Sequence, residues 1–197
     1  MFTGIIRATT DVLDHTTHNN LLVVTFLKPK GWGIGLGDSI ATNGVCLTVS
    51  DIGDTTYTAE LMEETLTKSS FGTTIPEQVN LETSLTLNSL LDGHIVQGHV
   101  DTTGTIIART DSGGSACITV RISNINPTLV IPKGSITIDG ISLTVVDVHK
   151  DKITVSLVDY TLDNTIAGEY WQVDTIVNIE YDMIGKYIAR YMQYTQN

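Results

Sequence analysis

Most of the chain consists of short apolar runs, and a turn signal separates each run from the next. The runs are rich in Val, Ile, Thr and Leu, which suit the pleated backbone of a strand. Asn-Gly, Asp-Gly and Gly-Gly pairs lie between them, as expected for tight connections. The runs lie at 21–27, 39–49, 55–62, 118–122, 135–145 and 152–158. Short strands at this spacing predict an all-β fold, either a sandwich or a small barrel.

Two of these runs are close copies of one another. Residues 39–49 read SIATNGVCLTV and residues 135–145 read SITIDGISLTV, with six of eleven positions identical. The offset, 135 − 39 = 96 residues, is about half of the 197-residue chain. A segment repeated at half the chain length indicates two copies of one module.

The repetition extends along both halves of the chain. Three further pairs match: LLVVTFL (21–27) with CITVRIS (117–123), residues 62–66 with 158–162, and VNLE (79–82) with VNIE (177–180). The sequence therefore predicts a module boundary near residues 92–94, with residues 83–94 as a short connector.

The repeated motif also predicts which side chains share a face. Successive side chains of a strand point to opposite faces, so Ser142 and Thr144 lie on one face and the apolar residues between them on the other. Cys46 and Thr48 are the matching pair in the first copy. This prediction requires an extended segment, and a bulge at the Asn-Gly or Asp-Gly pair would change the register.

The last residues follow a different pattern. In MIGKYIARYMQYTQN, which begins at Met183, apolar side chains recur at helical spacing. They are Ile184, Tyr187, Ile188, Tyr191 and Met192. The pattern predicts one amphipathic helix after two β modules. Two interpretations stay open, because the apolar stripe could pack on its own chain or join subunits in an oligomer.

Composition and charge narrow the class of protein. Hydrophobic residues make up 41% of the chain and charged residues 17%, which is typical of a globular protein. A formal net charge of −11 opposes binding to nucleic acid or to anionic membranes. No apolar run approaches the roughly 20 residues of a membrane helix, and MFTGIIRATTD does not resemble a secretory signal. With only two cysteines, Cys46 and Cys117, we expect reduced thiols in a cytoplasmic protein.

Few side chains suggest chemistry by their pattern alone. The segment GHIVQGHVD (93–101) holds His94 and His99, which would face opposite ways on a regular strand and lack the further ligands that a metal needs. His99, beside Gly98, is a candidate for proton transfer, although either histidine could be structural. Cys46 could be a packing residue or a nucleophile. The glycines of GWGIGLGD (31–38) lack the surroundings of a dinucleotide fingerprint.

Four segments together resemble one known family. MFTGII, the SIATNGVCLTV and SITIDGISLTV pair, GHIVQGHVD and VNIEYDMIGKYIAR are similar to riboflavin synthase of the α-chain type, over nearly the whole chain. The resemblance implies two similar six-stranded antiparallel Greek-key barrels and a C-terminal α-helix. It places a lumazine-binding barrel at 1–94, a second at 95–182 and an oligomerisation helix at 183–197. It also implies a homotrimer with active sites between subunits.

The activity implied is a dismutation. Two molecules of 6,7-dimethyl-8-ribityllumazine exchange a four-carbon unit, giving riboflavin and 5-amino-6-ribitylaminouracil, with no cofactor and no metal. Two identical substrates must then play different roles. A duplicated barrel with a thiol at Cys46 and a hydroxyl at Ser142 could distinguish the two molecules.

The resemblance implies catalytic roles for Phe2, Ser39, Cys46, His99 and Asp182. Phe2 lies at the active site. Ser39 and Cys46 are candidates for assisting nucleophilic addition at C7 of one lumazine. His99 is the candidate base for the acidic C7 methyl group of the other, and Asp182 belongs to the same proton-transfer group.

The same resemblance implies a larger set of substrate-binding residues in both halves of the chain. The first half supplies Gly4, Ile5, Ile6, Cys46, Leu47, Thr48, Glu60, Leu61, Met62, Glu63, Glu64 and Thr65, and the start of the second half supplies Gly98, His99 and Val100. The second half supplies Lys133, Ser142, Leu143, Thr144, Val158, Asp159, Tyr160, Thr161, Leu162 and Asp163.

Two rival functions belong to other classes. Proteins of the same fold bind lumazine or flavin as fluorescent antennae without catalysis. This chain keeps Ser39, Cys46, His99 and Asp182 together, which favours an enzyme. A β-barrel flavin reductase would need a nicotinamide site, and the sequence contains no pattern for one.

Overall fold

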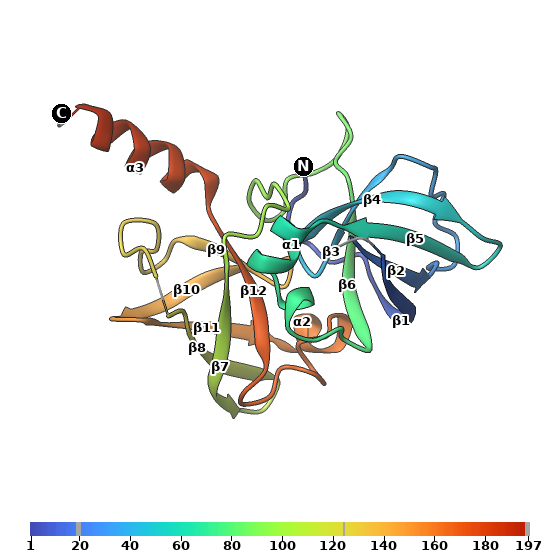
Figure 1. Ribbon diagram of the computed structural model, residues 1–197. Helices are drawn as coiled ribbons and strands as arrows, with labels where there is room; N and C mark the ends of the chain where they lie inside the picture. The colour runs from blue at the N-terminus through green and yellow to red at the C-terminus, as the bar shows by residue number, and fades with distance from the viewer. Residues whose placement is uncertain (19–20, 124, 196–197) are drawn as a thin grey trace.

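The protein consists of two closed six-stranded barrels and a C-terminal helix (Figure 1). The computed structural model describes residues 1–18, 21–123 and 125–195. All strand pairs are antiparallel. The predicted fold class, two similar all-β barrels followed by one helix, is confirmed.

The first barrel closes in the order β1-β2-β5-β4-β3-β6. Its strands are β1 (Ala8–His18), β2 (Leu21–Leu27), β3 (Ser39–Thr42), β4 (Val45–Ile52), β5 (Thr56–Leu61) and β6 (Gln78–Thr83). A short helix, α1 (Glu63–Lys68), and a single 3-10 turn, η1 (Ser70–Gly72), follow β5. They lead the chain to the last strand of the barrel.

The second barrel repeats this order as β7-β8-β11-β10-β9-β12. Its strands are β7 (Thr102–Asp111), β8 (Ser115–Arg121), β9 (Ser135–Ile138), β10 (Ile141–His149), β11 (Lys152–Val158) and β12 (Ile176–Tyr181). The helix α2 (Asp159–Asn164) occupies the place of α1. The internal duplication predicted from the sequence is therefore a duplication of the barrel itself.

Alternation along the strands fills both barrels with apolar side chains. In β4 the side chains of Val45, Leu47 and Val49 are buried, whereas Cys46 is half-buried and Thr48 is exposed. The matching strand β10 has the same pattern, so the predicted outward row of small polar groups is confirmed in both copies. The bulges lie beyond the motif, after Val49 and after Val145, so they leave its register intact.

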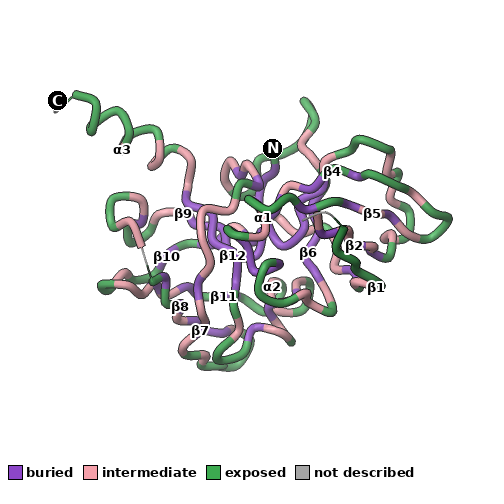
Figure 2. Tube along the Cα trace, in the orientation of Figure 1, coloured by how far each residue is buried: buried purple, intermediate pink, exposed green. Residues whose placement is uncertain are grey.

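The barrels touch through two matching turns. Asn43-Gly44 and Asp139-Gly140 each form a two-residue connection with positive φ at both residues, the geometry of a type I′ hairpin. A Cβ built on Gly140 would lie 2.8 Å from the backbone nitrogen of Gly44. The close approach of the two backbones therefore requires glycine, and Figure 2 shows the buried chain gathered where the barrels meet.

Two asparagines bond across this contact in the same way. The Asn80 side chain donates to the Asp139 carbonyl at 2.9 Å, and the Asn178 side chain donates to the Asn43 carbonyl at 2.8 Å. Both asparagines are buried. The repeated pair of bonds relates the two barrels by an approximate two-fold symmetry.

Helix α3 (Met183–Thr195) extends away from both barrels (Figure 1). The five apolar side chains predicted to form a stripe are exposed by 53 to 70%. They do not pack on the chain's own barrels, so the first of the two interpretations left open above does not hold for them. The last two residues of the predicted helix, 196–197, lie outside the described residues. None of the described helices has the length and apolar character needed to cross a membrane.

Candidate functional site

A pocket of about 240 Å³ lies on the first barrel, between α1 and residues 98–100 of the second repeat. It brings together the thiol of Cys46 and the imidazole of His99, two of the five predicted catalytic residues. Its lining consists of Val45, Cys46, Met62, Glu64, Thr65, Lys68, Ser69, Gly98, His99 and Val100. One pocket is therefore built from both repeats.

A glycine covers Cys46. The Cys46 N–H donates to the Gly98 carbonyl at 2.9 Å, and Gly98 has φ of +79°. A Cβ built on Gly98 would lie 2.6 Å from the Cβ of Cys46 and 3.0 Å from the ring of Phe2. Only glycine allows this backbone to approach the thiol so closely.

Phe2 lies behind the pocket rather than on its surface. Its side chain is fully buried and packs with Ala41, Val96 and Cys46. Its backbone pairs with Val96 through two hydrogen bonds of 2.7 and 3.1 Å. The structure therefore places the buried ring of Phe2 beneath Cys46, where it forms part of the wall.

The second barrel carries a matching arrangement with different chemistry. The Ser142 N–H donates to the Gly4 carbonyl at 2.7 Å, as Cys46 does to Gly98. The Ser142 hydroxyl lies 2.7 Å from Nδ1 of His94, and Nε2 of that histidine lies 3.2 Å from the Thr137 hydroxyl. A hydroxyl and an imidazole therefore form a hydrogen-bonded pair where the first barrel has a thiol.

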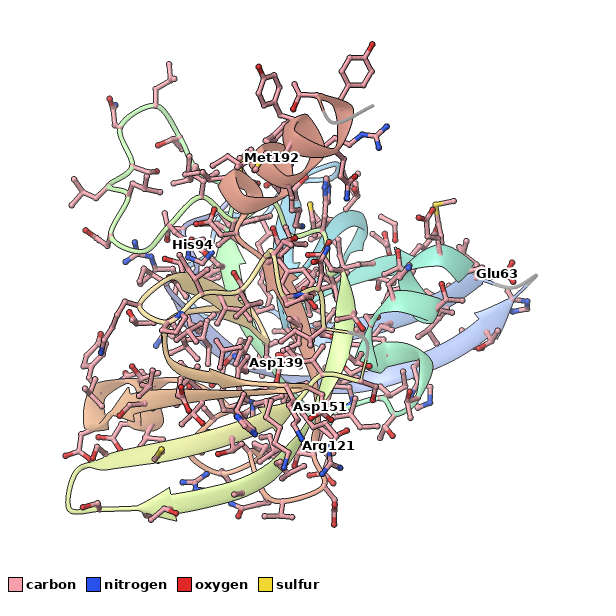
Figure 3. The ribbon with its side chains drawn as sticks, turned by 90° about the vertical axis from the view of Figure 1, so that its left-hand side faces the viewer. Glu63, His94, Arg121, Asp139, Asp151 and Met192 are labelled. Atoms are coloured by element: carbon pink, nitrogen blue, oxygen red, sulfur yellow. The ribbon has the colours of Figure 1, made fainter. Side chains whose placement is uncertain are left out.

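Sequence reasoning did not place His94 in a site. It assumed a regular strand through GHIVQGHVD, but this segment has only an isolated bridge at Val96, so strand alternation does not apply to His94 and His99. His94 is half-buried, and burial lowers its pKa while the nearby Asp182 opposes that shift. Figure 3 shows His94 between the α3 end of the molecule, marked by Met192, and Asp139 at the barrel contact.

The other two predicted catalytic residues lie outside the Cys46 pocket. Ser39 pairs with Thr48 on the neighbouring strand and lines a different pocket, of about 390 Å³, with residues 33–34, 38, 40 and 83–86. Asp182 accepts a hydrogen bond from the Ile184 N–H at 3.0 Å at the start of α3. Asp182 lies close enough to His94 to influence the pKa of that histidine, and it does not line the pocket of Cys46 and His99.

The side chains of three predicted binding residues point into the barrels and cannot contact a ligand bound outside them. Leu47, Leu61 and Leu143 are buried in the barrel cores. A ligand outside the barrel can reach only their backbone atoms. The inward direction follows from strand alternation, since each has outward-facing neighbours on its strand.

The remaining predicted binding residues lie around the outside of the barrels. Glu60 is the exposed next-to-last residue of β5, and residues 62–65 lead into α1 and form its first turn. Residues 158–163 occupy the same place in the second barrel, where Val158 and Tyr160 are strongly exposed. Lys133 has φ of +68°, and its N–H donates to the Val145 carbonyl at 2.7 Å, which places its backbone beside β10.

Three lining residues were not predicted: Val45, Lys68 and Ser69. Val45 begins the repeated motif, so the extent of that motif was a usable signal. Lys68 and Ser69 end α1, and nothing in their spacing indicates that a short helix folds over Cys46. Across the described residues, no group of three or more His, Cys, Asp or Glu side chains could hold a metal ion.

Comparison with known proteins agrees with the duplicated barrel. The family model described as "Lumazine binding domain" matches the chain twice, at residues 3–84 and 97–182. Among solved structures, LumP complexed with riboflavin superposes with a TM-score of 0.84 at 20% identity, covering 92% of this chain and 99% of that one. At this identity the likeness shows the fold alone. The molecule is thus a duplicated lumazine-binding barrel protein.

Curated relatives define the family more closely. The riboflavin synthase of Actinobacillus pleuropneumoniae is 40% identical over 194 residues, 98% of this chain and 90% of the relative. The riboflavin synthase of Mycobacterium tuberculosis (strain ATCC 25618 / H37Rv) is 42% identical over 199 residues, 98% of each chain. That of Bacillus subtilis (strain 168) is 38% identical over 195 residues, 98% of this chain and 90% of the relative. The chain belongs to the riboflavin synthase family.

Proposed function

We propose that this protein is a transferase that converts two molecules of 6,7-dimethyl-8-ribityllumazine into riboflavin and 5-amino-6-ribitylaminouracil by transfer of a four-carbon unit. The observation that carries the proposal is the pair of matched sites on one chain. Cys46 and Ser142 occupy equivalent places on the two barrels but offer different chemistry, since Cys46 shares a pocket with His99 and Ser142 bonds to His94. A reaction between two identical substrates needs such a difference to assign donor and acceptor.

We assign the catalytic roles that the family resemblance implies. Cys46 promotes nucleophilic addition at C7 of one lumazine, and Ser39, on the adjacent strand but in a different pocket, is the second candidate for assisting this step. His99 removes a proton from the C7 methyl group of the other, a general-base role that contributes roughly 10² to 10⁴ in rate. Holding the two rings together supplies a further large share, because positioning replaces a bimolecular encounter.

The complete site forms between subunits of a homotrimer, with the first barrel of one subunit facing the second barrel of the next. Asp182 does not line the pocket of Cys46 and His99 within one chain, which supports this arrangement, since a neighbouring subunit could supply Asp182 and Ser142. The exposed stripe of α3 supplies an apolar surface for assembly. Uncovered Val158 and Tyr160 at the second barrel are also consistent with a partner there.

Each barrel binds one lumazine. The binding units are residues 1–94 and 95–182, and the protein acts in the cytoplasm without an added cofactor. Residues 60–65 and 158–163 hold the ring and the ribityl chain, and Lys133 contacts the ligand of the second barrel. Phe2 and residues 4–6 contribute through packing and backbone contacts.

The test is to mix the purified protein with 6,7-dimethyl-8-ribityllumazine alone and to follow riboflavin by its absorbance. We expect riboflavin to appear at half the rate of lumazine loss, with no nicotinamide, flavin or metal added. Binding with shifted fluorescence but no turnover would instead identify an antenna protein on the same fold. A requirement for a nicotinamide would support the reductase alternative.

A further inference from the structure

Two glutamates are buried at matching places of the repeats, and neither has a role in the proposed reaction. Glu82 lies on β6 in VNLE and Glu180 lies on β12 in VNIE, with exposed fractions of 4% and 2%. Over the residues that the structure describes, neither carboxylate forms a salt bridge. A buried carboxylate is costly unless it is strongly hydrogen-bonded, so its bonding partners indicate its purpose.

Glu180 accepts hydrogen bonds from two consecutive backbone N–H groups. Its Oε1 accepts from Gln97 at 2.8 Å and its Oε2 from Gly98 at 2.9 Å. Charge-assisted bonds of this kind are about twice as strong as neutral ones. Residues 97–100 belong to no strand, so the carboxylate fixes a segment that has no strand ladder of its own.

The segment held by Glu180 forms one side of the Cys46 pocket. The Gly98 carbonyl accepts from the Cys46 N–H, and the Gly98 N–H donates to the Glu180 carboxylate. His99, the next residue, lines the pocket with Cys46. A carboxylate of the second barrel therefore places the backbone that covers the thiol of the first barrel.

Glu82 makes the same two backbone bonds in the other direction, and its Oε1 also accepts from the Thr3 hydroxyl at 2.6 Å. Its Oε1 accepts from the Thr3 N–H at 2.7 Å and its Oε2 from the Gly4 N–H at 2.9 Å. Gly4 in turn receives the Ser142 N–H on its carbonyl at 2.7 Å. In each barrel, a buried glutamate thus fixes the segment that precedes the first strand. That segment in turn bonds to the repeated motif of the other barrel.

We propose that Glu180 is a positioning residue for the Cys46–His99 pair, and that Glu82 has the same role for Ser142. Neither carboxylate touches a reacting atom. Each fixes a glycine-containing segment at the distance where its carbonyl bonds to the opposite motif. This inference rests on the proposed function for its effect on turnover, but the effect on the Cys46 thiol does not depend on that function.

The direct measurement is the rate at which Cys46 reacts with the thiol reagent 5,5′-dithiobis(2-nitrobenzoate). Cys117→Ser removes the other cysteine, which is exposed, and provides the parent protein. Glu180→Gln keeps the size of the side chain but turns an NH₂ group toward one of the two N–H donors. We expect Cys46 to react at least about tenfold faster, because losing a bond to a charged group shifts a local equilibrium by roughly that factor.

Glu82→Gln is the matched control, since it makes the same change at the equivalent buried position. It should leave the reaction rate of Cys46 near the parent value, because the neighbouring Phe2 keeps its own backbone bonds to Val96. Glu180→Asp retains the carboxylate and should give an intermediate rate. If Glu180→Gln does not fold, the comparison of Glu180→Asp with Glu82→Asp takes its place.

Equal acceleration by the changes at Glu82 and Glu180 would indicate general loosening and overturn the inference, as would no acceleration by either. In the lumazine assay, Glu180→Gln should lower kcat by a larger factor than it changes KM. If the parent protein turns over lumazine normally but the Glu180 and Glu82 variants do not differ in Cys46 reactivity, the proposed function stands and this role for Glu180 is rejected. A thiol contrast in a protein without turnover would do the reverse.

Discussion

Cys46 and Ser142 differ by one atom type in nearly identical backbone surroundings. Each donates its N–H to a glycine carbonyl of the other repeat. The structure therefore shows that the difference between the two sites lies in the side chains and not in the frame that holds them. A thiol ionises more readily than a hydroxyl and is the better nucleophile, so the first site is the one suited to addition chemistry.

Cys46→Ser makes the first motif resemble the second and should slow turnover while the barrel stays folded. We expect kcat to fall about tenfold or more, equivalent to about 1.4 kcal/mol in the barrier. Initial rates of riboflavin formation measure the effect. Cys117→Ser, at the exposed cysteine, is the control and should retain full activity. Undiminished turnover in Cys46→Ser would remove the thiol from the mechanism.

Asp139 is the second informative difference between the repeats, since its counterpart is Asn43. It is fully buried, and its two oxygens accept from the Asn178 N–H at 2.7 Å and from the Trp171 indole at 2.9 Å. Burial raises the pKa of Asp139 to about 7, although both hydrogen bonds oppose that shift. The contact between the barrels (Figure 3) thus contains a carboxyl group that titrates near neutral pH.

This pKa predicts a stability that depends on pH. The folded-state pKa of Asp139 is raised from 3.8 to about 7. The contribution of this residue to the free energy of unfolding is therefore fully present below pH 4 and is lost as the pH rises through 7. Buried Glu82 and Glu180 also have raised pKa values and act in the same direction. The free energy of unfolding, measured by urea titration, should therefore decrease between pH 5 and pH 8.

Asp139→Asn isolates the contribution of this residue. The variant should flatten the pH dependence by up to about 1.4 kcal/mol per pH unit. At pH 5 it should lose about 1 to 3 kcal/mol of stability, because the Trp171 indole would lose its acceptor. Asp54→Asn, in an exposed turn between β4 and β5, controls for the removal of one carboxylate. An unchanged slope in Asp139→Asn would contradict the assignment.

At the level of single elements, α3 is the part whose sequence and surroundings disagree. It is amphipathic, yet its apolar side chains face solvent in the isolated chain. A stripe of this kind is stabilised when a partner covers it. The proposed assembly through α3 would therefore explain the exposed stripe, which packing on the two barrels does not.

Ile188→Glu places a charge in the middle of this stripe. It should weaken subunit association by roughly 30-fold or more, the effect of about 2 kcal/mol at an interface hot spot. Sedimentation velocity over a range of protein concentrations measures the association. Arg190→Gln is the control, because it alters the net charge by the same amount at an exposed position outside the stripe. Equal association in both variants would argue against the helix as the interface.

In the whole molecule, the two hairpin tips fix how the barrels sit against one another. Gly44 and Gly140 both have positive φ, and each would clash with the other's backbone if it carried a Cβ. Gly37 also has positive φ, of +83°, but an added Cβ there would meet no atom within 4 Å. Alanine substitutions at Gly37 and at Gly140 can therefore be compared. The first measures the free-energy cost of backbone strain alone, and the second adds the cost of a lost contact between the barrels.

Gly37→Ala should lower the free energy of unfolding by about 1 to 2 kcal/mol, the cost of a left-handed conformation for alanine. Gly140→Ala should lower it by clearly more, because the barrels must also move apart. Urea denaturation of the two variants under identical conditions gives the comparison. Similar losses would mean that the contact between the tips contributes little to stability.

The fold was readable from the chain because its signals are local and repeated. Alternating apolar residues, Asn-Gly and Asp-Gly turns and the offset of 96 residues together specify two similar barrels. The outward row of Cys46 and Thr48 also followed from alternation alone. The helix was predictable for the same reason, since its apolar residues recur at the spacing of a helical turn.

The site was only partly readable, because it depends on segments that are distant in sequence and have no regular structure. Cys46 and His99 meet through Gly98, and His94 meets Ser142, at places that no periodic pattern encodes. In the sequence, Glu82 and Glu180 resemble ordinary strand residues. Only the structure shows their bonds to residues 3–4 and 97–98. Strands can be predicted from local patterns because neighbouring residues determine them. The contact of residues 3–4 and 97–98 with the opposite barrel, in contrast, forms only when the two folded halves pack together.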